Sequence, residues 1–282
     1  MFFSTNTKLK IARLLYGLVK FSRKIIGNSS DLLTCKRNNL TWSLNLKEGI
    51  DLSVYLFGCF EPKTEKAIRQ YVKPGMTVLD IGANVGAHAL PLAKYVGPTG
   101  RVYAIEPTDH AFKKLLKNKS LNPDLENTLI PIKATLNEPN GNQPKEIYSS
   151  WNLIDKNERH PRHGGVLSAV SNANNITLDA LVEQLNLSRI DFVKMDVDGF
   201  ECRILRGAKN TFRRFRPTMI LELSPYVLEE QGDSIEILLN LLREFGYQLY
   251  HENNQKQLPQ SIPELLKLIP KSGGINAIAL QS

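Results

Sequence analysis

Cysteine is scarce in this sequence, and the cysteines that occur are far apart. Cys35, Cys59 and Cys202 form neither a CxxC pair nor a cluster with histidine in the chain of 282 residues. An odd number of widely spaced cysteines lacks the pattern of a disulfide-stabilised secreted domain and the ligand spacing of a zinc site. The pattern argues against structural zinc and is typical of a reducing compartment, for which we expect the cytoplasm.

Long apolar runs are also missing. No stretch approaches the roughly 18 apolar residues that a membrane span needs. Arg13 and Lys20 interrupt the apolar stretch near the N-terminus, and no small-residue cleavage site follows it, which argues against a signal peptide. The composition, 42% hydrophobic and 23% charged, predicts a soluble globular body. Its length fits one large α/β domain with extensions, or two small domains.

Acidic residues are absent from the first 30 residues, which hold six of the 36 Lys and Arg residues. The rest of the chain therefore has 30 basic and 28 acidic residues, so the net charge of +8 comes mainly from its N-terminal segment. A nucleic-acid-binding protein concentrates positive charge on a binding face. Because the main body has no such excess, we expect no nucleic-acid partner.

The segment 1–30 predicts a basic amphipathic helix, because its apolar and basic residues fall on different sides of a helical wheel. The apolar side consists of Ile11, Leu14, Leu15, Leu18, Phe21 and Ile25. The basic side consists of Lys10, Arg13, Lys20 and Lys24. Such a helix either packs on its own domain or a partner, or lies on an anionic membrane face. Peripheral membrane contact is therefore the alternative to a purely cytoplasmic location.

Residues 31–73 predict short strands and one helix that pack on the core. The segments 40–46 and 51–58 have strand-like patterns, and 61–72 has helical spacing that ends before Pro74 and Gly75. From there on, strands and helices alternate: strands at 76–82, 100–107 and 128–136, helices at 85–97 and 109–122. Alternation of this kind predicts right-handed βαβ units and a mostly parallel sheet, in an α/β domain over 74–282.

Residues 137–175 interrupt the alternation with a stretch rich in Asn, Pro, Gly, Ser and His. A loop of this length is usually functional or mobile, so we expect it to form an acceptor-side insertion with short strands. The alternation resumes with helices at 177–186, 200–212 and 234–246 and strands at 189–197, 217–223, 247–251 and 274–280. A connection with little regular structure joins the last two strands, which predicts an antiparallel hairpin.

The string DIGANVG at 80–86 is a glycine turn between a strand and a helix, and three kinds of ligand compete for it. A triphosphate requires GxxxxGK[ST], which the sequence lacks. A dinucleotide requires a middle glycine, and this position is Asn84. Asp80 would repel a phosphate but would attract a cation. The turn therefore favours S-adenosylmethionine, which carries an ammonium and a sulfonium and no phosphate.

The expected donor contacts follow from this choice. Gly82 and Gly86 let the methionine portion lie against the turn, and Asn84 with the helix amino terminus receives its carboxylate. Glu106 stands 20 residues after Gly86, at the end of the next strand, where an acid can bind a ribose hydroxyl. The alternative is that Asp80 only caps the helix and that Glu106 is solvated.

A second group of charged residues lies in DFVKMDVDGFE, at 191–201. Lys194 and Asp196 lie on one strand face and approach the crevice that also holds Asp80. We expect Lys194, Asp196 and Glu222 to be catalytic. Asp196 would take a proton from a hydroxyl acceptor, with Lys194 adjusting its charge or acting as a neutral amine. Alternatively, a divalent cation held by Asp196, Asp198 or Glu222 would acidify a sugar hydroxyl.

Several strings, in this order along the chain, resemble FkbM-type methyltransferases: LFGCFEP, VKPGMTVLDIGANVGAHAL, GRVYAIEP, ITLDALVEQLNLSRIDFVKMDVDGFECRILRGA and RPTMILEL. The resemblance covers about residues 50–282 and implies a Rossmann-like class I fold: a mostly parallel seven-stranded sheet with an antiparallel C-terminal hairpin. It implies S-adenosylmethionine as donor and places Lys194, Asp196 and Glu201 in a second family motif. Asp198 departs from the family, which usually has Glu there. The expected donor pocket comprises Glu61, Asp80, Gly82, Ala83, Asn84, Gly86, Glu106 and Ala134.

Together these observations predict an S-adenosylmethionine-dependent O-methyltransferase. Its acceptor would be a hydroxyl of a sugar, a glycan or a secondary metabolite. The alternatives are an N-methyltransferase or protein methyltransferase, and a non-catalytic module that residues 1–30 attach to a membrane. His88, His160 and His163 are further candidates for the acceptor side, with packing on the glycine-turn helix as the other interpretation of His88.

Overall fold

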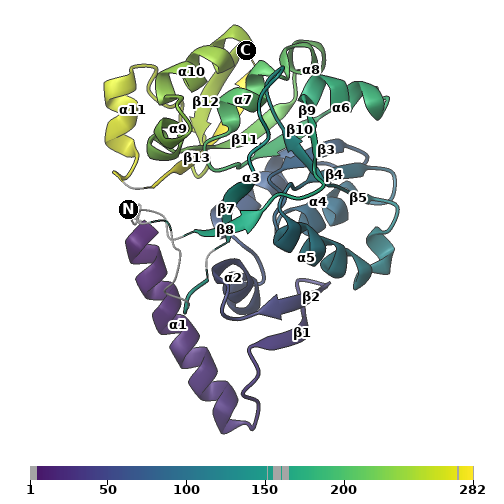
Figure 1. Cartoon of the computed structure of the whole chain (residues 1–282), viewed down its shortest axis with the longest axis vertical. Coiled ribbons are helices and arrows are strands. Elements are labelled where there is room, and N and C mark those ends of the chain that lie inside the picture. Colours follow the sequence, from purple (N-terminus) through teal and green to yellow (C-terminus); the bar gives the residue numbers. More distant parts are fainter. Residues whose placement is uncertain (1–4, 151, 155–159, 161–164, 272, 282) are drawn as a thin grey trace.

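The computed structural model describes residues 5–150, 152–154, 160, 165–271 and 273–281. A seven-stranded sheet forms its centre, with helices on both faces (Figure 1). In spatial order the strands are β12 (Tyr247–His251), β13 (Ile275–Gln281), β11 (Thr218–Leu223), β10 (Phe192–Met195), β3 (Thr77–Ile81), β4 (Arg101–Ile105) and β5 (Leu129–Ile132). Only β13 runs antiparallel to its neighbours, so the predicted Rossmann-like sheet with its C-terminal hairpin is confirmed.

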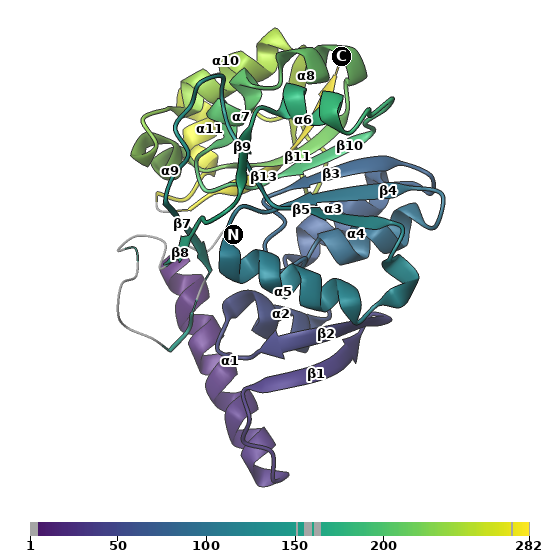
Figure 2. The same cartoon turned by 45° about the vertical axis from the view of Figure 1, so that its right-hand side comes forward.

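One face of the sheet is covered by α6 (Leu178–Gln184), α7 (Glu201–Arg206), α8 (Lys209–Phe215) and α10 (Ile235–Glu244). The opposite face is covered by α3 (Pro62–Tyr71), α4 (Ala89–Val96) and α5 (Asp109–Ser120). Figure 2 shows the two helical layers above and below the sheet. All four residues of β10 are buried, as expected of a central parallel strand covered on both faces.

Local capping explains where some helices begin. The Thr177 hydroxyl accepts a hydrogen bond from the Ala180 amide at the start of α6, and Ser234 does the same for Ile237 in α10. Such caps satisfy an amide that has no partner within the helix.

Short elements complete the chain: β6 (Ala134–Leu136), β7 (Glu146–Ser150), β8 (Val166–Ala169), β9 (Asn174–Ile176), α9 (Pro225–Glu230), α11 (Ile262–Leu268) and the 3₁₀ turn η1 (Pro123–Leu125).

The structure corrects the prediction of a strand at 51–58, because this segment is helix α2 (Gly49–Phe57). Gly58 ends the helix in the left-handed conformation, with φ of 76°, and its amide bonds to the Val54 carbonyl. A glycine in this place is a common helix terminator. The apolar residues of this segment fit the period of a strand and the period of a helix alike. The buried Asp51, Leu52 and Val54 mark one face of the helix.

Two predicted elements are divided in the structure, and helices α9 and α11 were not predicted. The helix at 200–212 is divided into α7 and α8 at Gly207, where a Cβ atom would lie 2.2 Å from the Asn137 carbonyl oxygen. The strand at 128–136 is divided into β5 and β6, and β6 leaves the large sheet to pair with β9. The connection at 252–274, expected to have little regular structure, contains α11, with a proline in its first turn.

The N-terminal part forms a separate small layer below the sheet in the view of Figure 1. Helix α1 (Thr5–Ile25) packs beside α2, and the hairpin of β1 (Leu32–Arg37) and β2 (Leu40–Asn45) continues the layer. The side chains of Asn118 in α5 and Asn122 just after this helix accept hydrogen bonds from the amides of Ser43 and Thr41. These bonds fasten the layer to the core. Within the described residues, no helix is long and apolar enough to cross a bilayer.

Candidate active site

The glycine turn after β3 lies directly against the end of β10. Gly82 has φ of 81°, and a Cβ atom on it would lie 1.9 Å from the Asp196 carbonyl oxygen. The amides of Gly82 and Ala83 both bond to the Ile105 carbonyl of β4. Glycine is therefore required at position 82 by the approach of two protein segments. This contact holds the turn and Asp196 at one edge of the sheet.

Asn84 joins this turn to the end of β4. Its φ is 49°, a left-handed conformation that asparagine tolerates better than most residues. The Asn84 amide donates to Glu106 Oε2 at 3.0 Å, and the Thr108 amide donates to Glu106 Oε1 at 2.9 Å. Burial raises the pKa of Glu106, and the hydrogen bonds from Thr108 and Asn84 oppose that rise. The carboxylate of Glu106 is thus fixed in position beside the turn.

Gly86 serves the packing of helices. A Cβ atom there would lie 2.4 Å from Leu90 Cδ1 and 2.7 Å from Leu115 Cδ1. Among the described residues, Gly86 is not part of the lining of either cavity of the site. The space that its missing side chain leaves is filled by α4 and α5.

Lys194 lies between two carboxylates. It stands beside Asp80 in the register of β10 and β3. Its Nζ lies 3.1 Å from Asp196 Oδ2 and 4.0 Å from Asp80 Oδ1. Burial alone would lower the pKa of Lys194, but the carboxylates of Asp196, Asp80 and Glu61 outweigh it and raise this pKa above its ordinary value. Lys194 is therefore an ammonium at neutral pH, which disfavours the neutral-amine role.

Asp80 is fully buried, and neither of its carboxylate oxygens has a hydrogen-bond partner within the described structure. Burial raises its pKa, while the nearby Lys194 and His88 lower it. A buried carboxylate is costly unless a cation beside it, here Lys194, stays charged. The buried charges of Asp80 and Lys194 thus stabilise one another.

A first cavity, with about 550 Å³ of empty space partly open to solvent, begins at this edge of the sheet. Its lining includes the carboxylates of Glu106, Asp196 and Asp198, and no Lys or Arg among the described residues. The remainder of the wall is largely apolar. It includes Ile81, Ile105, Ala134, Leu136, Ile147, Phe200 and Ile204. The cavity thus combines an apolar slot with an acidic mouth.

A second cavity, with about 570 Å³ of empty space, adjoins the first. The two share Gly82, Asn84, Asp196 and Asp198 as lining residues. The second cavity is also lined by Ile50, Phe60, Ala83, Ala87, His88 and Lys194. Asp196 therefore faces both spaces, and its side chain is 30% exposed.

Three more carboxylates surround the turn after β10. Burial raises the pKa of Asp198, and repulsion from Asp196 and Glu201 raises it further. Burial likewise raises the pKa of Glu222, with Asp196 and Asp198 adding to it. The pKa of Glu201 is raised by burial to about 7. Its Oε1 accepts from the Val197 amide at 3.3 Å, so Glu201 holds the turn that presents Asp196 and Asp198.

Glu61 connects the second cavity to the C-terminal hairpin. It directly precedes α3, with φ of 48°, and its Oε2 lies 3.1 Å from Asn276 Nδ2 and 3.8 Å from His88 Nε2. His88 is buried, and its ring centroid lies 5.7 Å from that of Phe60. Neither Glu61 nor Glu222 is among the described residues that line the two cavities. Both residues lie behind the residues that line the cavities.

The metal ligands proposed from the sequence were Asp196, Asp198 and Glu222. Within the described residues, no group of three or more His, Cys, Asp or Glu side chains is arranged to hold a metal ion. The structure therefore does not bring these three carboxylates together as a metal centre.

The insertion at 137–175 contributes to the first cavity through β7. Ile147 and Tyr148 line the cavity, and the Tyr148 ring packs edge-on against His160, with centroids 4.8 Å apart. His160 Nε2 lies 3.3 Å from Glu230 Oε2 of α9. His163, also named from the sequence, lies outside the described residues.

Sequence reasoning missed most of the apolar wall of the first cavity. Of this wall only Ala134 was named in advance, whereas Leu136, Ile147 and Ile204 come from three separate elements and Phe200 directly precedes α7. Thr108, whose amide orients Glu106, was also missed. A usable signal was its place two residues after the acid, where a hydroxyl or amide can bond back to the carboxylate.

The protein family described as Methyltransferase FkbM domain matches residues 80–249, more than half of the chain. The matched segment begins at Asp80 and includes the glycine turn, Glu106, Lys194, Asp196 and Glu222. It thus includes nearly all of the lining of both cavities.

Two curated relatives are similar to parts of the chain. Hexuronic acid methyltransferase AglP from Haloferax volcanii is 28% identical over 139 residues, which are 48% of this chain and 50% of that protein. Probable cobalt-precorrin-6B C(15)-methyltransferase (decarboxylating) from Saccharolobus solfataricus is 29% identical over 169 residues, which are 52% of this chain and 79% of that protein. The chain thus matches only half of the length of the first relative.

Solved structures show more distant likenesses. Aeropyrum pernix fibrillarin, in complex with natively bound S-adenosyl-L-methionine, has a TM-score of 0.46 and 12% identity, covering 88% of this chain and 82% of that chain. Precorrin-6y C5,15-methyltransferase from Geobacter metallireducens has a TM-score of 0.43 and 11% identity, covering 78% of this chain and 88% of that chain.

Proposed function

Because the chain belongs to the FkbM methyltransferase domain family, whose methyl donor is S-adenosylmethionine, we propose that it methylates a hydroxyl group of a sugar or a glycan. The observation that carries this proposal is the position of Asp196. Its carboxylate faces both cavities and pairs with Lys194. A proton acceptor therefore stands at the boundary between a donor space and an acceptor space.

The charges of the first cavity fit a cationic donor. Glu106, Asp196 and Asp198 line it without a basic residue among the described lining, and Glu201 Oε2 nearby is buried without a hydrogen-bond partner. Such a surplus of carboxylates repels phosphates and attracts an ammonium or a sulfonium. The residues present thus fit S-adenosylmethionine better than a nucleotide.

The cavity also fits the two halves of adenosine. Glu106, held by the amides of Asn84 and Thr108, would bind the ribose hydroxyls. The slot between Leu136, Ile147 and Ile204 would hold the flat adenine ring. Asp80 would act indirectly, because it does not line either cavity within the described residues but holds Lys194 in place.

Methyl transfer to a hydroxyl releases the hydroxyl proton, which needs an acceptor. When bound, S-adenosylmethionine supplies a methyl group activated by its sulfonium. Asp196 would take the proton from the acceptor hydroxyl, and the ammonium of Lys194 would keep Asp196 ionised and oriented. Glu222 would have a supporting role behind the cavity. Burial and the charge of Asp196 raise its pKa, so Glu222 favours its protonated form and adds no negative charge against the ionised Asp196.

The acceptor class rests on two supports. The named activity of the Haloferax volcanii relative is hexuronic acid methylation, although the identity is 28% and half of that protein is matched. The second cavity is lined by polar side chains, Asn84, His88, Lys194 and Asp196, beside the aromatic ring of Phe60. Polar groups next to an aromatic face suit the hydroxyls and the apolar ring face of a sugar.

The test is methyl transfer from labelled S-adenosylmethionine to a panel of sugars, uronic acids and extracted glycolipids, with and without a chelator. We expect an O-methyl product from a sugar, and Asp196→Asn should retain donor binding but lose at least about 100-fold in kcat. An N-methyl product, or undiminished turnover by Asp196→Asn, would contradict the proposal. Glu183→Gln, a change in α6 outside both cavities, is the matched control.

A further inference from the structure

Helix α1 has two apolar faces, and it uses only one of them to pack on its own domain. The packed face consists of Leu9, Ala12, Leu15, Tyr16 and Val19, which pack with Leu46, Leu52 and Leu153. This face shares only Leu15 with the apolar face that the sequence predicted. Helix α1 does pack on its own domain, but the other five residues of the predicted apolar face are exposed to solvent.

The second apolar face is exposed to solvent. Ile11, Leu14, Leu18, Phe21 and Ile25 recur three and four residues apart, so they form one continuous stripe. Their exposed fractions range from 42% for Ile11 to 70% for Ile25, and Ile26 extends the stripe at 77%. Single exposed apolar residues are ordinary, but a contiguous stripe marks an interaction surface.

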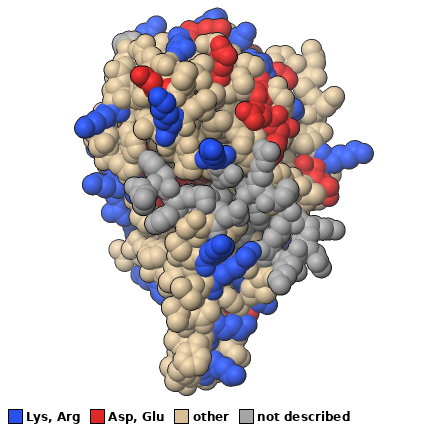
Figure 3. Space-filling model, turned by 90° about the vertical axis from the view of Figure 1, so that its left-hand side faces the viewer, with Lys and Arg blue, Asp and Glu red and all other residues tan. Residues whose placement is uncertain are grey.

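Basic residues form the third sector of α1, along one border of the stripe. They are Lys10, Arg13, Lys20 and Lys24. Figure 3 shows the face of the molecule that carries α1: Lys and Arg are spread over the whole face, whereas acidic residues gather mainly in its upper part, which leaves the basic residues prevailing in the lower part. The lower part therefore offers apolar surface bordered by positive charge.

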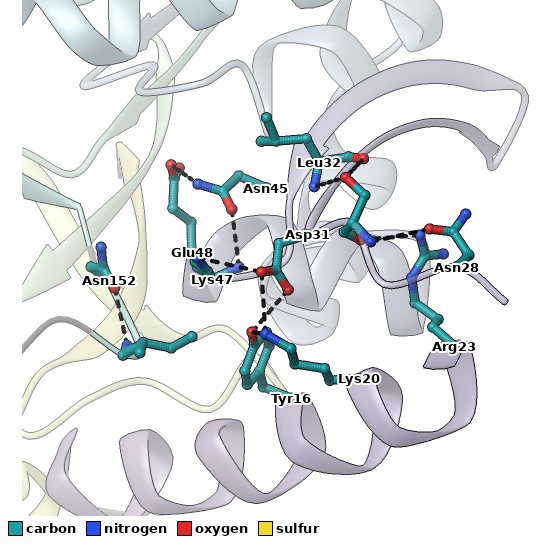
Figure 4. Close-up of polar contacts among 12 residues, drawn as sticks. Tyr16, Lys20, Arg23, Asn28, Asp31, Leu32, Asn45, Lys47, Glu48 and Asn152 are labelled. Carbon is teal, nitrogen blue, oxygen red and sulfur yellow. Dashed lines mark hydrogen bonds and ion pairs between the residues drawn. The ribbon is translucent and has the colours of Figure 1, made fainter. Parts of the chain in front are cut away.

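The protein holds this helix in a fixed orientation. The Tyr16 hydroxyl donates to Asp31 Oδ1 at 2.8 Å, and Lys20 Nζ lies 3.4 Å from Asp31 Oδ2 (Figure 4). Arg13 Nε donates to the Leu153 carbonyl at 3.1 Å, and an Arg23 Nη donates to the Ser30 carbonyl. These contacts hold the packed face inward, so the apolar stripe is directed outward without any rearrangement of the helix.

Two occupants are compatible with an apolar stripe of this period: a membrane surface and a second copy of the helix. In a paired helix the positions next to the stripe usually carry opposite charges that bridge the two chains. Here those positions are Lys10, Gly17 and Lys24 on one border and Leu15 and Ser22 on the other. With no acid in the first 30 residues, two copies would bring like charges together. The charge pattern matches anionic lipid headgroups instead.

We propose that α1 is an in-plane membrane anchor that binds an anionic bilayer surface through this stripe and its basic border. The apolar side chains enter the boundary between headgroups and acyl chains, and the lysines contact anionic headgroups. Leu153, on the chain segment after β7, packs against α1, and β7 itself lines the donor cavity. Docking would therefore hold the methyl-transfer site close to the membrane surface.

Co-sedimentation of the full chain with vesicles tests the proposal. Phosphatidylcholine vesicles are compared with vesicles that also contain phosphatidylglycerol, at low and at high salt. We expect binding to the anionic vesicles that high salt weakens. The variant Leu14→Gln/Leu18→Gln/Phe21→Gln should lower the partition coefficient at least about tenfold, and Lys10→Gln/Lys24→Gln should lower it by about fivefold for each lysine.

The matched control is Leu116→Gln/Leu266→Gln/Leu268→Gln, which replaces exposed leucines of α5 and α11. It should bind vesicles as the unchanged chain does, and all variants should bind S-adenosylhomocysteine equally, which shows that they are folded. Failure of the unchanged chain to bind anionic vesicles would overturn the proposal, as would equal binding by the stripe variant. A dimer in sedimentation velocity that the stripe variant dissociates, without vesicle binding, would assign the stripe to a second copy instead.

Discussion

The missing side chain of Gly82 leaves the space that the Asp196 carbonyl oxygen fills, because a Cβ atom at Gly82 would lie 1.9 Å from that oxygen. The first glycine of the turn is therefore needed for contact between two segments of the protein. This contact brings the residue that follows β3 against the proposed base that follows β10. The geometry of the donor turn and the geometry of the base are thus fixed together.

Gly82→Ala should lower the free energy of unfolding more than the backbone conformation alone explains. A left-handed conformation costs a residue with a Cβ roughly 1–2 kcal/mol, and forced overpacking costs about 1–3 kcal/mol more. Gly246→Ala is the matched control, because its φ is also 81° but a Cβ atom there meets nothing within 4 Å. Denaturant unfolding of both variants measures the difference. Equal losses would mean that the Gly82 contact is relieved without cost.

Lys194→Met should be strongly destabilising, because it leaves the fully buried Asp80 without its cation. Removing one partner of a buried ion pair typically costs about 3–5 kcal/mol. Adding Asp80→Asn to Lys194→Met should restore part of the loss, since the remaining buried charge is then removed. The exposed pair of Arg189 and Asp191 is the control, and Arg189→Met should change stability little. A double variant no more stable than Lys194→Met would show that Asp80 is not the group left unpaired.

The pKa of Glu201 predicts how stability depends on pH. Burial raises this pKa from 4.5 to about 7, so between these values the folded chain binds a proton that the unfolded chain has released. The contribution of Glu201 is complete below pH 4.5 and is lost as the pH rises to about 7. Each pKa unit corresponds to about 1.4 kcal/mol, so the loss is on the order of 3 kcal/mol.

Glu201→Gln tests this dependence, because an amide does not titrate. The difference in unfolding free energy between the unchanged chain and Glu201→Gln should change steadily from pH 4.5 to 7 and become constant above it. The raised pKa values of Asp198 and Glu222 also make stability fall as the pH rises. Both proteins contain these two residues, so their contribution cancels in the difference between the two unfolding free energies. Glu126→Gln, which alters an exposed ion pair, should show no such trend. A constant difference across this range would contradict the raised pKa.

Regular periodicity explains how much of the fold could be predicted from the sequence. The alternating strands and helices after residue 76 and the antiparallel hairpin follow from apolar patterns long enough to be unambiguous. The segment 51–58 was assigned to the wrong class because a short apolar run fits a strand and a buried helix equally. Helix α11 was missed in a connection expected to have little regular structure, although Pro263 stands in its first turn, where proline is favoured.

The charged part of the site was easier to foresee than its apolar part. Asp196 and Glu106 were named because acids at the carboxyl ends of parallel strands meet at one edge of the sheet, and both line the first cavity. Leu136 and Ile204 are ordinary apolar residues in their own elements. Only the departure of β6 from the sheet and the packing of α7 bring them to the same slot. Such long-range proximity has no local pattern in one sequence.

Glu106→Ala should weaken donor binding without unfolding the protein. The carboxylate of Glu106 accepts the amides of Asn84 and Thr108 and faces the first cavity. Its removal takes away the proposed ribose partner and frees the turn that carries Asn84. A charge-assisted hydrogen bond contributes about 1.5–3 kcal/mol, so the dissociation constant of S-adenosylhomocysteine should rise about 10–100-fold, as measured by calorimetry.

Two further variants separate these effects of Glu106. Glu106→Gln retains an oxygen that can accept one of the two amide bonds, so it should disturb the turn less than Glu106→Ala and still lose the charge-assisted bond to the ribose. Glu126→Ala, at an exposed glutamate outside the cavity, should bind the ligand as the unchanged chain does. If Glu106→Ala bound S-adenosylhomocysteine with unchanged affinity, Glu106 would only stabilise the turn, and the ribose would be held by another residue of the cavity.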